Sequence, residues 1–138
     1  MGNTVSCKKV NYEDLQECIS NKDRYIIINT LSANEQQCLI TNTVPIQKEE
    51  AIINETLQNY TEISIIIYGK NSNDDTIYKK YKQLQDLGFV NIYLYSGGLF
   101  EWLLLQDIYG QDDFPTTSQE LDILKYKPVK IINQYLIK

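Results

Sequence analysis

The sequence predicts an α/β domain of three layers, with a mostly parallel central sheet and helices on both faces. Three short apolar runs, RYIIINT, ISIIIY and VNIYLY, have the length of strands and few polar interruptions, which indicates burial on both sides. Segments with the periodicity of helices separate these runs. Such alternation is typical of parallel sheets, because each crossover between parallel strands places a helix on one face.

The first helix and the first strand have clear local signals. Asn11 and Asp14 have the spacing of a capping pair, which predicts a helix that ends near Ser20. Cys18 lies on the apolar face of this helix, so we expect a small core residue rather than a functional thiol. The run RYIIINT follows and predicts a buried strand that ends near Thr30.

The next segment predicts a strand, a break and a helix. CLIT, residues 38–41, predicts a short second strand, in which Cys38 would be a core residue at the edge. Pro45 breaks the chain after it. The following helix then has apolar side chains at helical spacing, at Ile53, Leu57 and Tyr60.

The alternation continues in the second half of the chain. After the strand ISIIIY and a polar loop, Ile77, Tyr81 and Leu84 share one face of a helix that ends at Gly88, a natural C-terminal cap. After the strand VNIYLY, the segment LFEWLLLQDIYG is apolar around most of its circumference, which predicts a buried helix. We expect Trp102 of this helix to lie in the core.

A C-terminal extension, residues 115–138, departs from this pattern. Thr117 and Glu120 have the spacing of a capping box before LDILKY, which predicts a short helix that Pro128 ends. The last apolar segment, VKIINQYLI, fits a helix or a strand equally well. We expect the extension to dock on the domain or on a partner, and a homo-oligomer is one such arrangement.

Composition excludes several classes of function. The chain has 138 residues, 43% of them hydrophobic and 22% charged, which predicts one compact globular domain. The net charge of −5 argues against nucleic acid as a partner. There is no histidine and Arg24 is the only arginine, which excludes Ser-His-Asp triads, Cys-His pairs and histidine-ligated zinc. We expect no metal ion and no cofactor.

The cysteines and the hydropathy pattern bear on the compartment. Cys7, Cys18 and Cys38 are odd in number and form no CxxC pair, which favours a reduced, cytoplasmic setting. No apolar run reaches the roughly 20 residues that span a bilayer.

The N-terminus carries a possible lipidation signal within residues 1–8, a segment that we expect to be flexible. MGNTVSCKK fits the myristoylation pattern M-G-x-x-x-[ST], with Gly2 as the acceptor and Ser6 in place. Cys7 would accept a second acyl chain, and the two lysines that follow would favour an anionic leaflet. The signal predicts peripheral membrane contact, whereas the alternative is an ordinary start of translation, because so short a pattern recurs by chance.

The segment GFVNIYLYSGGLFEW resembles the C-terminal motif of the rhodanese-like family. That motif consists of a Gly-Phe helix end, a strand, a Gly-Gly turn and an aromatic-rich helix with a tryptophan. Here these are Gly88-Phe89, residues 92–95, Gly97-Gly98 and Trp102. The resemblance covers roughly residues 9–109 and implies a rhodanese-like domain over residues 9–114.

The resemblance also implies which residues form the active-site loop. They are Gly69, Lys70, Asn71, Ser72, Asn73 and Asp74. In the family the first loop position is a cysteine that carries a persulfide, and the loop N–H groups and the next helix N-terminus stabilise its negative charge. Here that position is Gly69, and the usually basic last position is Asp74, followed by Asp75.

Two further family landmarks are altered. The Asp-x-Arg that usually follows the second strand of the family appears here as residues 29–31, Asn-Thr-Leu, after the run RYIII. The usual Gly-His-Ile-Pro-Gly-Ala appears as residues 38–43, Cys-Leu-Ile-Thr-Asn-Thr. A phosphatase related by fold would need a cysteine nucleophile and an arginine beyond the loop, and neither is present.

The acidic end of the loop suggests a change of function. Asp74 and Asp75 are good N-cap residues for the next helix, and their carboxylates would repel an anionic substrate. We therefore expect a catalytically inactive module that binds or regulates an unknown protein partner. The alternatives are an unorthodox sulfurtransferase that uses Cys38, and a flavodoxin-like domain that binds a small ligand.

Overall fold

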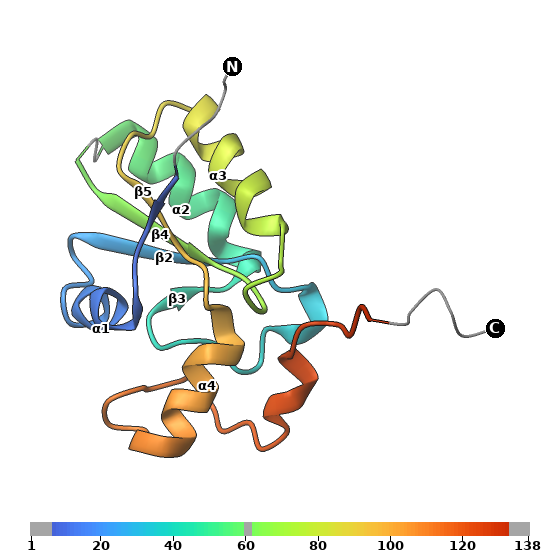
Figure 1. Ribbon diagram of the computed structural model, residues 1–138. Coiled ribbons are helices and arrows are strands. Elements are labelled where there is room, and N and C mark those ends of the chain that lie inside the picture. Colours follow the sequence, from blue (N-terminus) through green and yellow to red (C-terminus); the bar gives the residue numbers. More distant parts are fainter. Residues whose placement is uncertain (1–6, 60–61, 133–138) are drawn as a thin grey trace.

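The computed structural model describes residues 7–59 and 62–132, and its centre is a five-stranded parallel sheet (Figure 1). The spatial order is β1-β5-β4-β2-β3. The strands are β1 (Lys8–Lys9), β2 (Tyr25–Asn29), β3 (Thr43–Val44), β4 (Ser64–Tyr68) and β5 (Ile92–Tyr95). The predicted α/β class with a parallel sheet is confirmed.

The described residues also form four α-helices and two short 3-10 helices, and the last two of these elements follow the last strand. They are α1 (Tyr12–Ser20), the 3-10 helix η1 (Ala33–Glu35), α2 (Ile46–Asn59), α3 (Thr76–Asp86), α4 (Gly98–Tyr109) and the 3-10 helix η2 (Ile123–Tyr126). The capping pair at the start of α1 is present, because Asp14 N donates to Asn11 Oδ1 and Asn11 N donates to Asp14 Oδ2, both at 3.0 Å. Gly88, just after α3, has φ +111°, which fits its predicted role as a helix terminator.

The helices cover both faces of the sheet, because neighbouring strand residues point to opposite sides. One core contains Ile27 and Ile66 of the sheet with Leu15 of α1 and Trp102 of α4. The other core contains alternate strand residues with one or more buried side chains each from α2 and α3, namely Ile26, Ile28, Ile65, Ile67, Ile53, Ile77 and Leu84. Each fully buried apolar side chain of this size contributes about 1.5–3 kcal/mol. The three predicted layers are therefore present.

The predicted strand at residues 38–41 is wrong, since the second short strand is β3. The backbone groups of residues 39–41 bond elsewhere: Leu39 N donates to Thr117 Oγ1, Ile40 N to the Tyr68 hydroxyl and Thr41 N to Pro115 O. The C-terminal extension and the buried Tyr68 thus accept the hydrogen bonds that these residues would donate to a neighbouring strand.

Helix α2 presents a different face from the predicted one. Ile53 is buried as expected, but Leu57 is 38% exposed, and Thr56 is buried in its place. Tyr60 lies outside the described residues. The face of α2 that is buried against the sheet is therefore narrower and less apolar than its sequence suggests.

The extension packs on the domain without the predicted helix. Thr117 is no helix cap, because its hydroxyl bonds Leu39 N and Gln37 O, and Glu120 pairs with Lys125. Among residues 115–132, only η2 is helical. Tyr126 is 2% exposed and belongs to the core, and Trp102 Nε1 donates to Pro115 O at 3.1 Å. Residues 128–131 are neither helix nor strand, Ile132 lies in a turn, and residues 133–138 lie outside the described part of the chain.

The N-terminal end of the described chain is part of the sheet. Lys8 pairs with Tyr93 and Lys9 with Leu94, so the expected flexible segment, residues 1–8, includes one residue of strand β1. Gly2 lies outside the described residues. Within residues 7–59 and 62–132, no helix is long and apolar enough to cross a membrane.

Candidate functional site

The Gly69–Asp74 loop lies at the carboxyl edge of the sheet, between β4 and α3. This edge is where parallel α/β sheets bind ligands. The N-terminus of α4 holds the loop in place: Leu99 N donates to Gly69 O and Phe100 N to Lys70 O, both at 2.9 Å. The loop is therefore positioned by the helix that follows the Gly-Gly turn.

Gly98 permits this close contact between helix and loop. Its φ is +72°, and an added Cβ would lie 2.8 Å from Asn71 N and 2.9 Å from Gly69 O. A side chain at this position would collide with the backbone of the loop. The second glycine of the Gly-Gly motif is thus required by packing against the loop.

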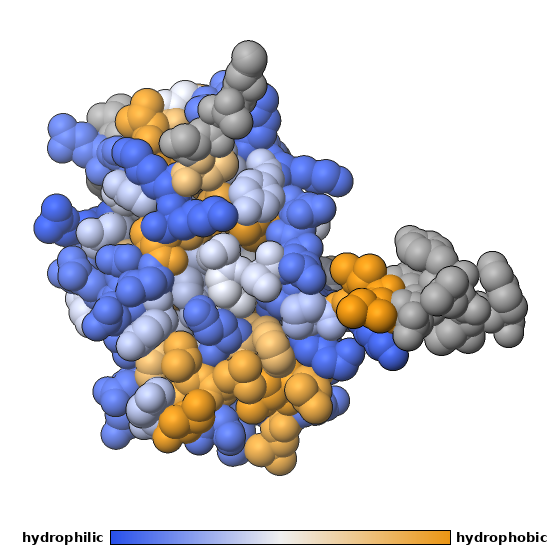
Figure 2. Space-filling view, in the orientation of Figure 1, coloured by the Kyte–Doolittle hydropathy of each residue, from blue (hydrophilic) through white to orange (hydrophobic). Residues whose placement is uncertain are grey.

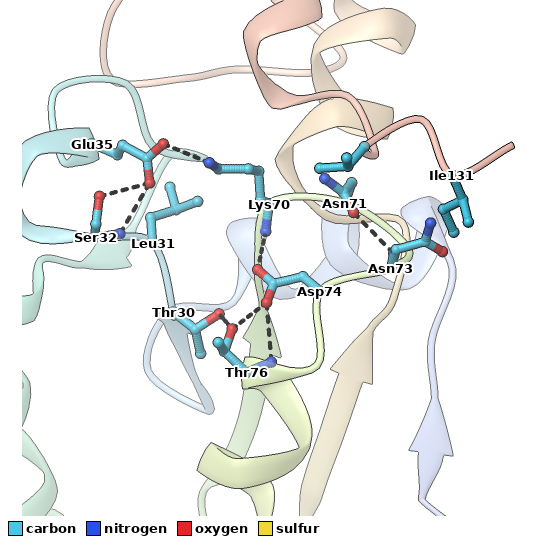
Figure 3. Close-up of a pocket in the computed structure, with 11 residues that line it drawn as sticks. Thr30, Leu31, Ser32, Glu35, Lys70, Asn71, Asn73, Asp74, Thr76 and Ile131 are labelled. Carbon is cyan, nitrogen blue, oxygen red and sulfur yellow. Dashed lines mark hydrogen bonds and ion pairs between the residues drawn. The ribbon is translucent and has the colours of Figure 1, made fainter. Parts of the chain in front are cut away.

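The side chain of Asp74 closes the loop on itself. Its Oδ2 accepts a hydrogen bond from Lys70 N at 2.8 Å, and its Oδ1 accepts from Thr76 N at 3.0 Å and from the Thr76 hydroxyl (Figure 3). An added Cβ on Gly69 would lie 2.4 Å from Asp74 Oδ2 and 2.8 Å from Thr30 Oγ1. A carboxylate therefore occupies the space into which any side chain at position 69 would point.

The two predicted capping residues differ in what their side chains do. Asp75 holds the N-cap position of α3, but its side chain is exposed and makes no capping bond. Its backbone is already helical, at φ −76° and ψ −11°. Asp74, one residue earlier, supplies the bond to the first turn, so one carboxylate faces the loop and the other faces solvent.

Asn71 fixes the middle of the loop to the C-terminal extension. This side chain is 7% exposed, donates to Tyr126 O at 2.8 Å and accepts from Asn73 N at 2.9 Å. Ser72 and Asn73 are exposed. The loop and the extension are therefore one hydrogen-bonded unit, which the sequence pattern did not indicate.

Lys70, the cation of the loop, is already paired. Lys70 Nζ lies 3.0 Å from Glu35 Oε2 of η1. Partial burial opposes ionisation of Glu35, but hydrogen bonds from Lys70 and Ser32 outweigh it and lower the pKa of this carboxyl below its ordinary value. Sequence analysis missed Glu35, because only the fold brings η1 to the loop.

These residues surround a pocket of about 440 Å³. Thr30, Asp74 and Thr76 form a polar part of its lining, and the hydroxyl oxygens of the two threonines are 2.7 Å apart. Val129 and Ile131 of the extension form an apolar part of the lining, and Figure 3 shows Ile131 beside the loop. The position of Thr30 at the end of β2 was a usable signal, because the ends of neighbouring parallel strands meet at one edge.

The altered landmarks have structural roles. Asn29 is 1% exposed, and its Oδ1 accepts from Leu31 N at 3.0 Å and from Gln36 Nε2 at 2.8 Å, which orders the turn after β2. Asn42 has φ +72°, a left-handed conformation that asparagine tolerates better than most residues. Asn42 stands where the family pattern has its second glycine, so the backbone conformation explains both residue types.

None of the cysteines lies in the loop, and two of them are core residues as predicted. Cys38 is 3% exposed, its Sγ donates to Ser118 O at 3.3 Å, and burial raises its pKa. Cys18 is 5% exposed, and burial, with Asp14 and Glu17 nearby, raises its pKa to about 11. Cys7 is half-buried at the start of the sheet.

No group of three or more potential metal ligands occurs in the part of the chain that the structure describes.

Tyr68, which was expected only as a strand residue, is fully buried. Its hydroxyl accepts a hydrogen bond from Ile40 N at 3.1 Å and bonds Thr43 Oγ1 at 2.9 Å. Burial raises the pKa of Tyr68, so this phenol stays protonated and structural.

Solved structures from several organisms share this fold. The BH2092 protein from Bacillus halodurans superposes with a TM-score of 0.57 at 19% identity, covering 75% of this chain and 74% of that one. A yeast protein tyrosine phosphatase of the rhodanese family gives 0.57 at 12% identity, covering 88% and 99%. The single-domain sulfurtransferase RDL2 of Saccharomyces cerevisiae gives 0.53 at 11% identity, covering 78% and 98%. At these identities the likeness concerns the fold.

No curated protein matches the sequence. The model of the rhodanese-like domain family matches residues 11–105, which is more than half of the chain. The flavodoxin-like alternative is therefore wrong, since the strand–helix alternation on which it rested is common to both folds. The chain belongs to the rhodanese-like domain family.

Proposed function

We propose that this rhodanese-like domain is a binding or regulatory module for a protein partner and does not transfer sulfur through its loop. The observation that carries the proposal is the Asp74 carboxylate, 2.4 Å from where a Cβ on Gly69 would be. In the family, as the resemblance implies, this position belongs to the persulfide cysteine. Here the chain's own anion takes the electrostatic place of that sulfur.

The hydrogen-bond donors of the loop support the same proposal. Lys70 N and Thr76 N both donate to Asp74, so these two donors are not free for a substrate anion. The ammonium of Lys70 is neutralised by Glu35. Among these three charged side chains the sum is −1, which repels thiosulfate, persulfide and phosphate alike.

Sulfur transfer through Cys38 is the competing function. It has to be considered because two yeast proteins with this fold, a sulfurtransferase and a phosphatase, are named as enzymes. A reactive cysteine needs an accessible, stabilised thiolate. Cys38 is buried, donates its proton to a backbone carbonyl and has a raised pKa. These features favour the binding module over the enzyme.

Transfer of sulfur from thiosulfate to cyanide tests both functions. We expect no turnover by the wild-type chain. Turnover that disappears in Cys38→Ser would replace the proposal with the enzyme. Slow labelling of Cys18 and Cys38 by a thiol reagent, accelerated by denaturant, is the expected result for an inert core.

Restoring the family nucleophile sharpens the test. We expect negligible transfer from Gly69→Cys, because the new side chain meets Asp74 and its thiolate would face a carboxylate rather than a cation. Adding Asp74→Arg removes that carboxylate and supplies a cation, so the double variant should gain measurable activity. The matched control is Gly69→Cys with Asp75→Arg, which adds the same charge but leaves the loop carboxylate in place and should stay inactive. Robust activity of Gly69→Cys alone would contradict the role of Asp74.

A second part of the proposal is a cytoplasmic module that is held at a membrane by its N-terminus. The motif at Gly2 supports it, and Cys7 is half-buried rather than locked in the core. One myristoyl chain binds a membrane with K on the order of 10⁴ M⁻¹, so stable attachment needs the second chain on Cys7. Labelling with a myristate analogue in a eukaryotic host should be lost in Gly2→Ala, and absence of label in the wild type would refute this part.

A further inference from the structure

An exposed apolar patch covers the outer side of α4 and the segment around η2. Figure 2 shows it as a group of hydrophobic side chains over these elements. We define the patch by the exposed fractions of its members: Leu104 39%, Ile108 68%, Tyr109 64%, Leu121 83% and Leu124 61%. Leu104 and Ile108 are four residues apart and so lie on one face of α4. Contiguous exposure of this kind is typical of a binding surface.

A second exposed apolar region is the C-terminal arm, which we define as residues 127–132. Val129, Ile131 and Ile132 are 74%, 63% and 75% exposed. Figure 1 shows the arm leaving the body of the domain after η2. Val129 and Ile131 line part of the loop pocket, so the arm of a chain lies on the loop side and leaves that chain's own patch uncovered.

The surroundings of the patch and the arm have opposite charge. The arm carries Lys127 and Lys130 and no acidic residue, whereas residues 100–126 carry six carboxylates and one lysine. That lysine, Lys125, is paired with Glu120. Four exposed carboxylates border the patch in sequence and form no ion pair within the described residues: Asp107, Asp112, Asp113 and Asp122.

We propose that the C-terminal arm of one copy of this chain docks on the apolar patch of a second copy. Isoleucine and valine side chains of the arm would cover the leucines and Ile108 of the patch, while the arm lysines face the bordering aspartates. A two-fold axis would let both copies exchange arms, which closes the assembly as a dimer. The arm shares Val129 and Ile131 with the lining of the loop pocket, but the interface does not depend on the proposed function.

The oligomeric state of the full-length chain tests this interface. Light scattering over a range of protein concentrations should show the wild-type mass rising from one chain toward two. Ile108→Lys in the patch and Ile131→Glu on the arm should each keep the mass at one chain, a twofold reduction at high concentration. Val90→Lys is the matched control, because Val90 is 75% exposed and lies outside both regions, so its mass should follow the wild type.

Mixing the two variants gives the decisive measurement. The Ile108→Lys chain has an intact arm and the Ile131→Glu chain has an intact patch, so one native contact remains between them. The other contact pairs the new glutamate with the new lysine. We therefore expect the mixture to regain the mass of two chains, and high salt to weaken this complex.

Three outcomes would overturn the proposal. They are a wild-type chain that stays monomeric at every concentration, a dimer that survives Ile131→Glu, and a mixture that remains monomeric. Circular dichroism of each variant checks that it is folded, which is expected because both substituted side chains are exposed.

Discussion

The Gly97-Gly98 turn and the Gly69–Asp74 loop touch each other, yet they match the family pattern to very different degrees. The turn has the family's residues, and Gly98 allows α4 to donate to Gly69 O and Lys70 O. The loop, which the resemblance aligns with the family's active-site loop, contains no cysteine and ends on Asp74. The difference shows that the packing that places the loop and the chemistry inside the loop are separate properties of the sequence.

The largest effect should come from the core beneath the turn. Trp102 is fully buried, packs against Phe114 at 5.0 Å between ring centroids and donates to Pro115 O. Trp102→Ala should lower the free energy of unfolding by about 3–5 kcal/mol, as large-to-small core substitutions do. Urea titration measures it. Tyr78→Ala, at a side chain that is 40% exposed, should lower the free energy of unfolding far less. An equal decrease in both variants would show that the burial of Trp102 does not stabilise the core.

Gly98→Ala should produce the next largest effect. A non-glycine residue at positive φ costs about 1–3 kcal/mol, and here the Cβ would also collide with Asn71 N. Gly88→Ala is the matched control, because Gly88 has φ +111° but nothing within 4 Å of an added Cβ. The excess loss of thermal stability in Gly98→Ala isolates the contact with the loop. If the two variants melt alike, close packing is not the reason for this glycine.

Removing the loop carboxylate should cost less again. Asp74→Ala leaves Lys70 N and Thr76 N without their acceptor, and loss of a helix cap typically costs about 0.5–2 kcal/mol. Asp75→Ala removes a neighbouring carboxylate that makes no capping bond, so it should be nearly neutral. Urea midpoints of the two variants give the comparison. An equal loss in both would mean that charge near the helix end, rather than the bonds of Asp74, is what matters.

The smallest expected effect is the pH dependence of the Lys70–Glu35 pair. Because the folded-state pKa of Glu35 is lowered, its contribution is fully present above the unfolded pKa of about 4.3 and is lost as pH falls through the folded value. The pair is partly exposed, so Glu35→Gln should cost about 0.2–1 kcal/mol at neutral pH and nothing in strong acid. Glu50→Gln, at an exposed side chain, should give no such pH profile.

Sequence reasoning located the loop but not its surroundings. The loop could be placed because a buried strand, a polar turn and an amphipathic helix follow one another along the chain. Glu35 could not be assigned to it, since it lies in η1, which no local pattern places beside the loop, whereas Thr30 could have been, because it follows a strand that pairs in parallel with β4. The strand predicted at residues 38–41 failed for a related reason, because residues 115–117 supply its hydrogen-bond partners.

The sequence by itself determined the layers and the family. Apolar strands and capped helices are local patterns, and the hydrophobic effect acts on them wherever they lie in the chain. Tertiary structure alone decided that Asp74 rather than Asp75 points into the loop, that Lys70 is paired, and that α4 and η2 leave an apolar face uncovered while the arm leaves the body. These features depend on side-chain directions and on contacts between distant segments, which local periodicity does not encode.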